Sequence, residues 1–327
     1  MLSTRAFGTT GITSTTIGFG AWAIGGTWGE VTETAAKDTL NAALDAGMTF
    51  IDTADVYGDG RSERLIAEVL VTRPGPRPFV ATKAGRRLSP HEAAGYRDLT
   101  AFIDRSRQNL QMDCLDLLQL HCPPTMAYHD NAVFDVLDDL KSRGIIAHYG
   151  VSVETVAEAM AAIARPGVAS VQIIYNMFRP RPSARFFRAA EKLGVAVIAR
   201  VPLASGLLTG KMSAASTFAA DDHRSFNRNG EAFDMGETFS GVPYDIGLAA
   251  VDELRALVPA GATMAQFALR WIMMDPALSV VIPGAKTPEQ AQANAAADGL
   301  PAIPADVMAA TRDVYDRLIA PHVAHRW

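Results

Sequence analysis

Short apolar segments recur along this chain, and residues with a helical spacing fill the intervals between them. Each segment is apolar at nearly every position, which is typical of strands that are covered on both faces in a parallel sheet. Because parallel strands need a crossover connection, the alternation predicts repeated strand–helix units. The eight expected strands are Thr16–Phe19, Thr49–Ile51, Phe79–Ala81, Leu115–Leu120, Ile145–Val151, Val171–Ile174, Val195–Ala199 and Ser279–Ile282.

Parallel strands joined by right-handed crossovers form either an open sheet or a closed barrel. Eight units without a linker between two halves favour the barrel, so we expect an α/β chain with a (β/α)8 TIM barrel. The length of 327 residues would by itself suggest two domains, but barrels reach about 250 residues as one unit. We therefore expect residues 1–327 to form a single domain.

Several helix boundaries can be placed on this pattern. Ser62 is expected to cap the helix that follows the second strand, because a serine hydroxyl can accept from the first free backbone N–H groups. Gly47, Gly144 and Gly194 each stand where a helix gives way to the next strand, which is the usual position of a left-handed residue.

Two segments lie outside the repeat. Residues 2–15 carry the turn signal Gly8-Thr-Thr-Gly11 and predict a small β-hairpin ahead of the first barrel strand. Lys211–Tyr244 forms a long loop after strand 7, rich in Gly, Asp, Asn, Arg and Phe and without a sustained period; such loops are usually functional. A simple excursion over the surface is an equal alternative. The side chains that could cover a cofactor or line a pocket are Arg224, Phe226, Arg228, Phe233 and Phe239.

The composition limits the class of protein. The chain is 49% hydrophobic and 20% charged, unlike a disordered chain, and its net charge of −5 without a basic block argues against a nucleic-acid partner. It has no signal peptide and no apolar stretch of about 18 residues, so we expect a cytoplasmic protein without a membrane partner. Cys114 and Cys122 are too few for a disulfide framework or a cysteine-rich metal site, and no metal is expected.

Two glycine-rich motifs imitate nucleotide-binding loops. Gly18–Ala23 matches the G-x-G-x-x-[GA] pattern, but that pattern needs a helix directly after it, and we expect none before about Thr32. Gly206–Lys211 is similar to a Walker A loop, but its first glycine is one residue too close and Met212 replaces the magnesium-binding Ser or Thr. We therefore interpret Gly18–Ala23 as no dinucleotide-binding motif and Gly206–Lys211 as no Walker A loop.

Four polar side chains follow consecutive expected strands. Asp52 ends the second strand and Tyr57 follows five residues later, while Lys83 ends the third strand and His121 the fourth. Each alone has an ordinary structural interpretation, such as a turn cap or a buried histidine. In a barrel, however, all four share the C-terminal rim, where the active sites of this fold lie.

The chemistry of this group is coherent. A tyrosine hydroxyl is a weak acid, and Lys83 is expected to favour its ionised form while Asp52 keeps Lys83 in place and charged. A neutral His121 could hydrogen-bond a substrate oxygen beside Tyr57. Without an evident nucleophile, such a group suits protonation of a carbonyl oxygen while a cofactor supplies hydride.

The segment Asp52-Thr-Ala-Asp-Val-Tyr57-Gly58, with Thr82-Lys83 and Leu120-His121, resembles the aldo-keto reductase superfamily, and in particular bacterial-type aldo/keto reductases. The resemblance covers nearly the whole chain. It implies a β/α barrel closed at the bottom by an N-terminal hairpin and a catalytic tetrad of Asp52, Tyr57, Lys83 and His121. It also implies that Tyr57 is the general acid and that hydride passes from the nicotinamide of NADP(H).

The resemblance implies further residues at the nicotinamide end. Ser152 and Gln172 would hold the carboxamide, although Val153 stands where the family has Asn. Arg200 stands where the family has an aromatic residue that stacks on the ring; a guanidinium plane can also stack. The whole expected set of cofactor-binding residues is Trp22, Ser152, Gln172, Arg200, Pro202, Leu203, Ser205, Gly206, Leu207, Lys211, Gly284, Lys286, Gln290 and Asn294.

The segments Pro202–Lys211 and Ile282–Asn294 resemble those that meet the pyrophosphate and the adenosine end. Lys286 suits a 2′-phosphate beside a helix N-terminus, where anions are favoured. Gln290 stands where many NADP-dependent relatives have Arg. The resemblance therefore favours NADP(H), with NAD as the other possibility.

The function expected is an NADP(H)-dependent oxidoreductase that interconverts an aldehyde or ketone with an alcohol, acting on a small carbonyl or sugar substrate. Three alternatives stay open. The same site could serve an NAD(P)-dependent aldose 1-dehydrogenase, or the chain could be a nucleotide-binding regulatory subunit without significant turnover. A barrel lyase or isomerase without nicotinamide would leave the two cofactor segments without a purpose.

Overall fold

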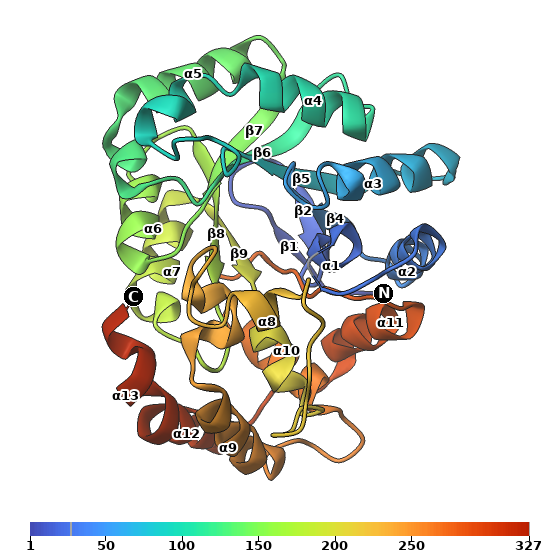
Figure 1. The fold of residues 1–327 in the computed structure, drawn as a ribbon, viewed down its shortest axis with the longest axis vertical. Coiled ribbons are helices and arrows are strands. Elements are labelled where there is room, and N and C mark those ends of the chain that lie inside the picture. The colour runs from blue at the N-terminus through green and yellow to red at the C-terminus, as the bar shows by residue number, and fades with distance from the viewer. Residues whose placement is uncertain (27, 327) are drawn as a thin grey trace.

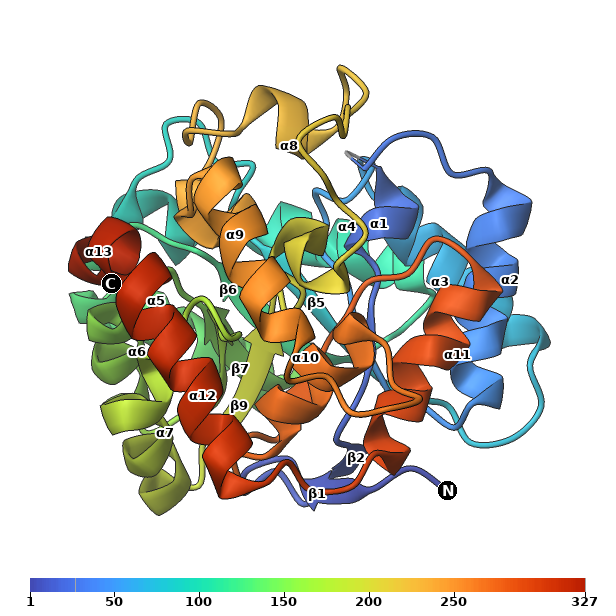
Figure 2. The same ribbon diagram turned by 90° about the horizontal axis from the view of Figure 1, so that it is seen from below.

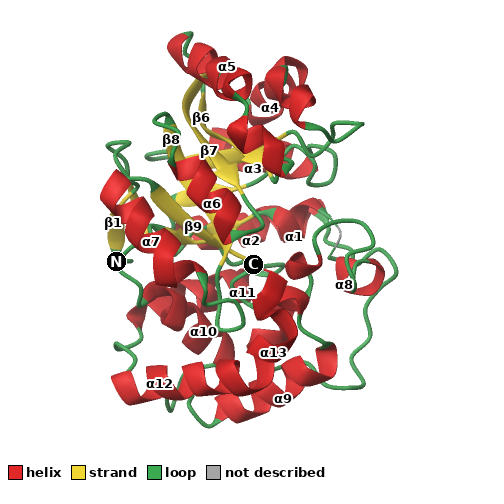
Figure 3. Cartoon of the chain, turned by 90° about the vertical axis from the view of Figure 1, so that its left-hand side faces the viewer, coloured by secondary structure: helices red, strands yellow, loops and turns green. Residues whose placement is uncertain are grey.

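The computed structural model describes residues 1–26 and 28–326, and eight parallel strands lie at its centre with helices outside them (Figure 1, Figure 3). Each strand pairs with its neighbour in the sequence. All eight predicted strands are present, with ends shifted by a few residues. They are β3 (Phe19–Gly20), β4 (Phe50–Asp52), β5 (Phe79–Ala84), β6 (Leu115–His121), β7 (Ile146–Ser152), β8 (Val168–Ile174), β9 (Ala196–Arg200) and β10 (Val280–Val281).

The first and last strands also meet, which closes the sheet. Gly18 and Gly20 donate backbone hydrogen bonds to the carbonyls of Val281 (2.8 Å) and Pro283 (3.0 Å), and isolated parallel bridges accompany them. A Cβ atom at Gly20 would lie 2.6 Å from the carbonyl oxygen of Ile282, so this close approach requires glycine. The predicted (β/α)8 barrel is therefore confirmed.

The helices cover the outside of the barrel. Two predictions of where helices begin are wrong. α3 begins at Arg61 after a left-handed Gly60, so Ser62 is not its cap; the Ser62 hydroxyl is buried and donates to the Ala21 carbonyl (3.1 Å). A one-turn helix also follows the first strand, where none was expected before Thr32. The helices are α1 (Trp22–Gly25), α2 (Glu33–Asp45), α3 (Arg61–Thr72), α4 (Thr100–Leu110), α5 (Asn131–Ser142), α6 (Val156–Ile163), α7 (Pro182–Leu193), α8 (His223–Phe226), α9 (Tyr244–Arg255), α10 (Met264–Met273), α11 (Pro288–Ala296), α12 (Ala305–Val314) and α13 (Ala320–Val323).

The three predicted left-handed glycines are confirmed. Gly47, Gly144 and Gly194 have φ values of +95°, +70° and +66°. Gly194 shows why no side chain fits: a Cβ atom there would lie 2.3 Å from the methyl carbon of Thr9 in the N-terminal hairpin. Gly194 therefore ends α7, and its lack of a side chain leaves room for Thr9 of the hairpin.

The N-terminal hairpin is present as predicted and lies under the barrel. β1 (Thr4–Ala6) pairs antiparallel with β2 (Thr13–Thr15), and Figure 2 shows the pair at the end of the molecule opposite α8. Directly after β1, Phe7 is fully buried with its ring centroid 5.3 Å from that of Phe50 and 5.5 Å from that of Phe79. Phe7 therefore plugs the bottom of the barrel.

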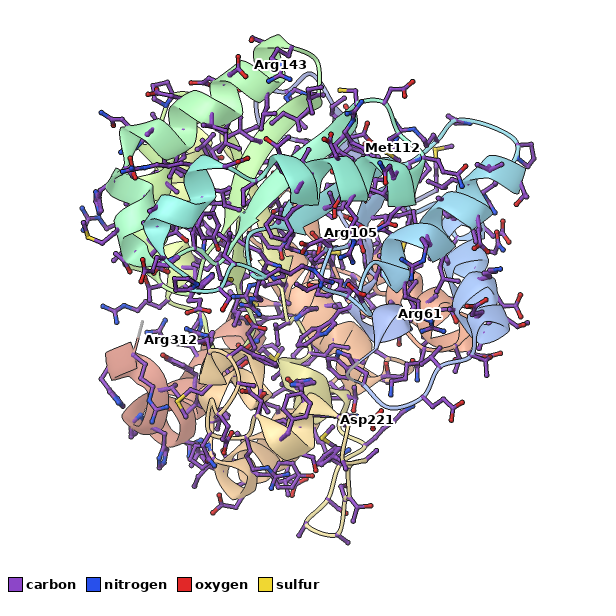
Figure 4. The ribbon with its side chains drawn as sticks, turned by 45° about the horizontal axis from the view of Figure 1, so that its top comes forward. Arg61, Arg105, Met112, Arg143, Asp221 and Arg312 are labelled. Carbon is purple, nitrogen blue, oxygen red and sulfur yellow. The ribbon has the colours of Figure 1, made fainter. Side chains whose placement is uncertain are left out.

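The long segment between β9 and α9 lies across the other end, at the C-terminal ends of the strands. Figure 4 labels Asp221 on the part of the segment that leads into α8. Further along, the Ser205 hydroxyl donates to the Glu237 carbonyl (2.8 Å) and accepts from the Phe239 N–H (3.0 Å). The segment is thus fastened to its own beginning. Of its predicted pocket aromatics, Phe226 lies instead on the surface and Phe239 in the core.

Within residues 1–26 and 28–326, no helix is both long and apolar enough to cross a membrane.

Candidate active site

The strand register brings several polar residues to the same end of the barrel. Lys83 pairs with Gln119 across β5 and β6, and His121, Ser152 and Gln172 lie side by side across β6, β7 and β8. Because all strands are parallel, every one of these side chains emerges at the same rim.

Lys83 is the centre of the predicted tetrad. Its ammonium is fully buried and donates to Asp52 Oδ1, to the Thr53 carbonyl (2.8 Å) and to the Tyr57 hydroxyl (3.3 Å). The second oxygen of Asp52 accepts from Gln119 Nε2 (3.1 Å) and Gln172 Nε2 (2.7 Å). The cation thus has a fixed counter-ion, which burial of a charge requires.

Burial decides how readily Tyr57 ionises. Desolvation raises the pKa of Tyr57, and the nearby Lys83 ammonium lowers it only in part, so the net direction is upward. The sequence predicted the lysine effect but not the larger effect of burial. Burial also opposes the charge of Lys83, but attraction to Asp52 and Tyr57 outweighs it and the Lys83 pKa is raised. The pair is therefore a neutral phenol beside a permanent cation.

His121 lies beside Tyr57 with its ring centroid 6.1 Å from the phenol ring. Burial lowers its pKa well below the usual value, and the positive charges of Arg86, Lys83 and Arg200 lower it further. The imidazole is therefore neutral. Its Nδ1 atom is buried without a hydrogen-bond partner among the described residues, which suits a polar atom that meets a ligand.

Most of the predicted residues line a single cavity of about 460 Å³. Asp52, Tyr57 and His121 lie at its inner end, and Lys83 sits behind Tyr57 rather than on the wall. Leu207 is buried elsewhere, in contact range of Gly247. The other expected cofactor residues all line the cavity: Trp22, Ser152, Gln172, Arg200, Pro202, Leu203, Ser205, Gly206, Lys211, Gly284, Lys286, Gln290 and Asn294.

Backbone strain marks the wall that follows β9. Val201, Ala204 and Ser205 have φ values of +51°, +47° and +54°, and Gly206 has +100°. A β-branched residue at positive φ is a rare and costly conformation, and such residues gather at ligand-binding loops. The loop that the sequence assigned to the pyrophosphate is therefore held in an unusual shape at the cavity.

The opposite wall is built around the first turn of α11. Thr287 caps this helix by accepting from the Gln290 N–H, and the Gln290 side chain in turn accepts from the Lys286 N–H (2.8 Å). The Lys286 ammonium, half-buried, donates to the Trp28 carbonyl. A lysine and a helix N-terminus therefore face the same end of the cavity, where an anion is favoured.

Trp22 and Trp28 belong to the cavity wall beside Tyr57, and His223 and Phe233 pack against them. The Trp22 ring stacks nearly parallel to the Tyr57 ring, with centroids 6.0 Å apart and an interplanar angle of 17°. His223 packs against both Trp22 (4.8 Å) and Trp28 (4.5 Å), and Phe233 closes the group. Burial lowers the pKa of His223 to about 4, so this wall is uncharged apart from the arginines around it.

Arg200 is tied to its neighbours by its guanidinium group. One nitrogen lies 3.2 Å from Glu237 Oε1, and the other donates to the Val153 carbonyl (3.1 Å) and lies 3.7 Å from Cys122 Sγ. Arg86 approaches the same Glu237 oxygen at 2.8 Å. The side chain that replaces the expected aromatic is thus part of a buried ion pair that reaches the long segment.

This fold and rim can be compared with known proteins. A family model described as "Aldo/keto reductase family" matches residues 16–316. The chain belongs to the aldo/keto reductase family. Oxidoreductase is therefore the enzyme class to which it belongs, and the predicted family is confirmed.

Curated relatives match this aldo/keto reductase over most of its length. It is 32% identical over 295 residues to the aldo-keto reductase YhdN of Bacillus subtilis, covering 87% of this chain and 85% of that protein. It is 28% identical over 306 residues to a probable voltage-gated potassium channel subunit beta of Arabidopsis thaliana, with 89% of each covered.

Solved structures share the fold. The glycerol dehydrogenase of Gluconobacter oxydans matches with a TM-score of 0.73 and 28% identity, over 96% of this chain and 94% of that one. An aldo-keto reductase of Bacillus halodurans in its holo form matches with a TM-score of 0.75 and 22% identity, over 96% of each chain. An aldo-keto reductase of Klebsiella pneumoniae, in complex with NADPH, matches with a TM-score of 0.68 and 21% identity, over 96% of each.

Several residues of the reductase site were not singled out from the sequence. Gln119 could have been found, because a polar residue within a buried apolar strand is an informative signal. Arg86 could also have been found, because it follows the end of β5, three residues after Lys83. Trp28, His223 and Glu237 lie in segments without a sustained period. Only the folded chain brings Trp28 and Glu237 to the cavity and His223, at the start of α8, against Trp28.

Proposed function

We propose that this chain is an NADP(H)-dependent oxidoreductase that interconverts an aldehyde or ketone with an alcohol, with Tyr57 as the proton donor and acceptor. The observation that carries the proposal is the contact between the neutral Tyr57 hydroxyl, which lines the cavity, and the buried Lys83 ammonium behind it (3.3 Å). A proton donor of this kind is required where a carbonyl oxygen becomes a hydroxyl.

In the direction of reduction, the carbonyl carbon gains hydride and its oxygen gains the Tyr57 proton. The tyrosinate left behind is stabilised by Lys83, whose charge Asp52 and the Thr53 carbonyl hold in place. Neutral His121 orients the substrate oxygen through a hydrogen bond. In oxidation the same groups act in reverse, with tyrosinate as the base.

The residues of the cavity fit a dinucleotide cofactor, whose nicotinamide would supply or accept the hydride. Ser152 and Gln172 line the inner end, where the Gln172 Nε2 atom is already bonded to Asp52. The carbonyl oxygen of Gln172 is therefore the atom that would accept from a carboxamide. The strained loop at Val201–Gly206 would meet the pyrophosphate.

The preference for NADP(H) rests on Lys286 at the far end of the cavity, near the first turn of α11. The Klebsiella relative in complex with NADPH supports the same choice. NAD(H) is the alternative, because Gln290 adds no charge beside Lys286.

Replacement of Tyr57 tests the proposal. Tyr57→Phe removes the hydroxyl and leaves the stacked ring, so turnover of aldehydes with NADPH should fall by about 10²-fold or more. Nucleotide affinity, measured by tryptophan fluorescence, should change little. Turnover close to that of the wild type would remove Tyr57 from this role.

Two relatives favour alternatives. The glycerol dehydrogenase supports oxidation of a polyol or a sugar at the same site, including an NAD(P)-dependent aldose 1-dehydrogenase. The plant channel subunit supports a nucleotide-binding regulatory role. A screen of aldehydes with NADPH beside aldoses with NADP⁺ and NAD⁺ separates them, since a regulatory subunit would bind nucleotide without appreciable turnover in any arm.

A further inference from the structure

Glu237 is a buried carboxylate in the cavity that the proposed proton transfer does not use. It belongs to the long segment after β9, is 4% exposed, and lines the cavity with Tyr57 and His121. Burial of a carboxylate is costly unless charged partners compensate for it. Its position therefore calls for an explanation beyond the reaction.

Two arginines from the barrel rim converge on this carboxylate. Arg86, just after β5, lies 2.8 Å from Glu237 Oε1, and Arg200, at the end of β9, lies 3.2 Å from the same atom. Burial alone would raise the pKa of Glu237, but the two arginines outweigh it and lower this pKa to about 2. Glu237 is therefore ionised throughout the physiological range.

Paired guanidinium groups are the usual receptor for a carboxylate. Arg200 and Glu237 line the same cavity as Tyr57 and His121, and Arg86 contacts Glu237 from outside that lining. The receptor thus lies beside the groups that would meet a carbonyl oxygen. In this chain, the carboxylate of Glu237 itself binds the two guanidinium groups.

We propose that Glu237 is a specificity-determining residue, which occupies a two-arginine carboxylate site and so excludes carbonyl substrates that carry a carboxylate. The proposal rests on the carbonyl chemistry proposed above. An anionic substrate would meet the like charge of Glu237 and arginines that are already paired, whereas a neutral aldehyde or ketone pays neither penalty. Removal of the Glu237 charge would open the site to anions.

The test compares butanal with 4-oxobutanoate, which have chains of equal length, by kcat/KM with NADPH. The wild type should favour butanal, and Glu237→Gln should shift the ratio toward 4-oxobutanoate by about tenfold or more. Glu237→Asp retains the charge and should keep the wild-type preference. Glu154→Gln is the matched control, because Glu154 lies 3.6 Å from Arg86 but does not line the cavity; it should leave the ratio close to wild type.

A binding measurement decides the proposal without turnover. Butanoate, titrated against the fluorescence of Trp22 and Trp28 with saturating NADP⁺, should bind Glu237→Gln about tenfold more tightly than wild type. Butanamide should bind both equally. Absence of turnover with every aldehyde would refute the proposed function, whereas equal butanoate binding, or an equal gain in Glu154→Gln, would refute the role of Glu237. If Glu237→Gln does not fold, the wild type alone still tests the proposed role of Glu237: equal kcat/KM values for butanal and 4-oxobutanoate would refute it.

Discussion

Tyr57 is buried beside a cation, and the two effects on its hydroxyl oppose each other. Burial keeps the phenol neutral, while Lys83 stabilises the anion that forms when the proton leaves. In the proposed reduction, the ground state would therefore hold the proton that is consumed, and the cation would act when charge develops. The buried Asp52 makes this arrangement durable, because it keeps Lys83 charged.

Removal of the Lys83 ammonium should therefore affect the chemical step more than binding. Lys83→Met is expected to lower kcat by about 10²- to 10⁴-fold. Nucleotide affinity should change little, because Lys83 does not line the cavity. Steady-state kinetics and a fluorescence titration measure the two quantities. A kcat within a few-fold of the wild type would show that Tyr57 acts without the cation.

Lys286→Ala should separate the two nicotinamide cofactors. We expect the Kd for NADPH to rise about tenfold, as for loss of one charge-assisted hydrogen bond, and the Kd for NADH to change much less. Tyr57→Phe is the control, because it alters the other end of the cavity. Equal losses for both nucleotides would place the 2′-phosphate elsewhere.

Glu154 gives stability a pH dependence with an unusual sign. Burial raises its pKa to about 7 from the ordinary 4.5, and Asp234 adds to the shift. Because the folded state disfavours the charged form, this residue lowers stability above pH 7, and the loss disappears as the pH falls to 4.5. Glu154→Gln should therefore raise the free energy of unfolding at pH 8 by about 1–3 kcal/mol. Thermal unfolding at pH 8 and pH 4.5 checks this, and an equal gain at both values contradicts it.

Several of the residues predicted from the sequence share one property: they lie at or next to the end of a regular strand. Asp52, Lys83 and His121 follow apolar runs, so the periodicity that locates the strand also locates the side chain. Glu237 has no such marker. Its contact with Arg86 and Arg200 depends on the path of the long segment, which shows no periodicity. Arg86 and Glu237 are also 151 positions apart in the chain, so no local pattern connects them.

At the level of elements, strands were predicted better than helix ends. A strand in a parallel sheet is apolar on both faces, which leaves a strong signal. A helix end depends on single contacts, and the Ser62 hydroxyl bonds to the Ala21 carbonyl in the adjoining loop rather than to its own helix. Tertiary contact therefore overrides the local preference for a cap.

The N-terminus of α6 shows a cap that is fully formed. The Thr155 hydroxyl accepts from the Glu158 N–H (3.1 Å), and the Glu158 side chain accepts from the Thr155 N–H (3.1 Å). Thr155→Ala should lower the free energy of unfolding by about 1 kcal/mol. Thr72→Ala, at the exposed end of α3, is the control and should have a smaller effect in the same urea titration. Equal effects would mean that the cap is not what stabilises α6.

For the whole molecule, we propose that residues 1–327 are one domain, with the hairpin as part of the barrel. Phe7→Ala would leave a cavity among Phe50 and Phe79, and should lower the free energy of unfolding by about 3–5 kcal/mol. The nucleotide affinity of the folded protein should be unchanged, because the plug lies at the end opposite the cavity. Calorimetry should show one transition at a lower Tm. A hairpin that melts separately, without lowering the main transition, would refute this.

The ion pair between Glu237 and the rim arginines limits how this protein can be recombined with its relatives. Exchange of a loop usually transfers what the loop contacts, because the strands beneath stay the same. Here the segment carries Glu237, whereas Arg200 ends β9 and Arg86 lies just after β5. A chimera that received a foreign segment alone would keep both arginines without Glu237, and among the described residues only Glu154, 3.6 Å from Arg86, would remain as a carboxylate partner. The long segment, Arg86 and Arg200 would therefore have to be exchanged together, although they are far apart in the sequence.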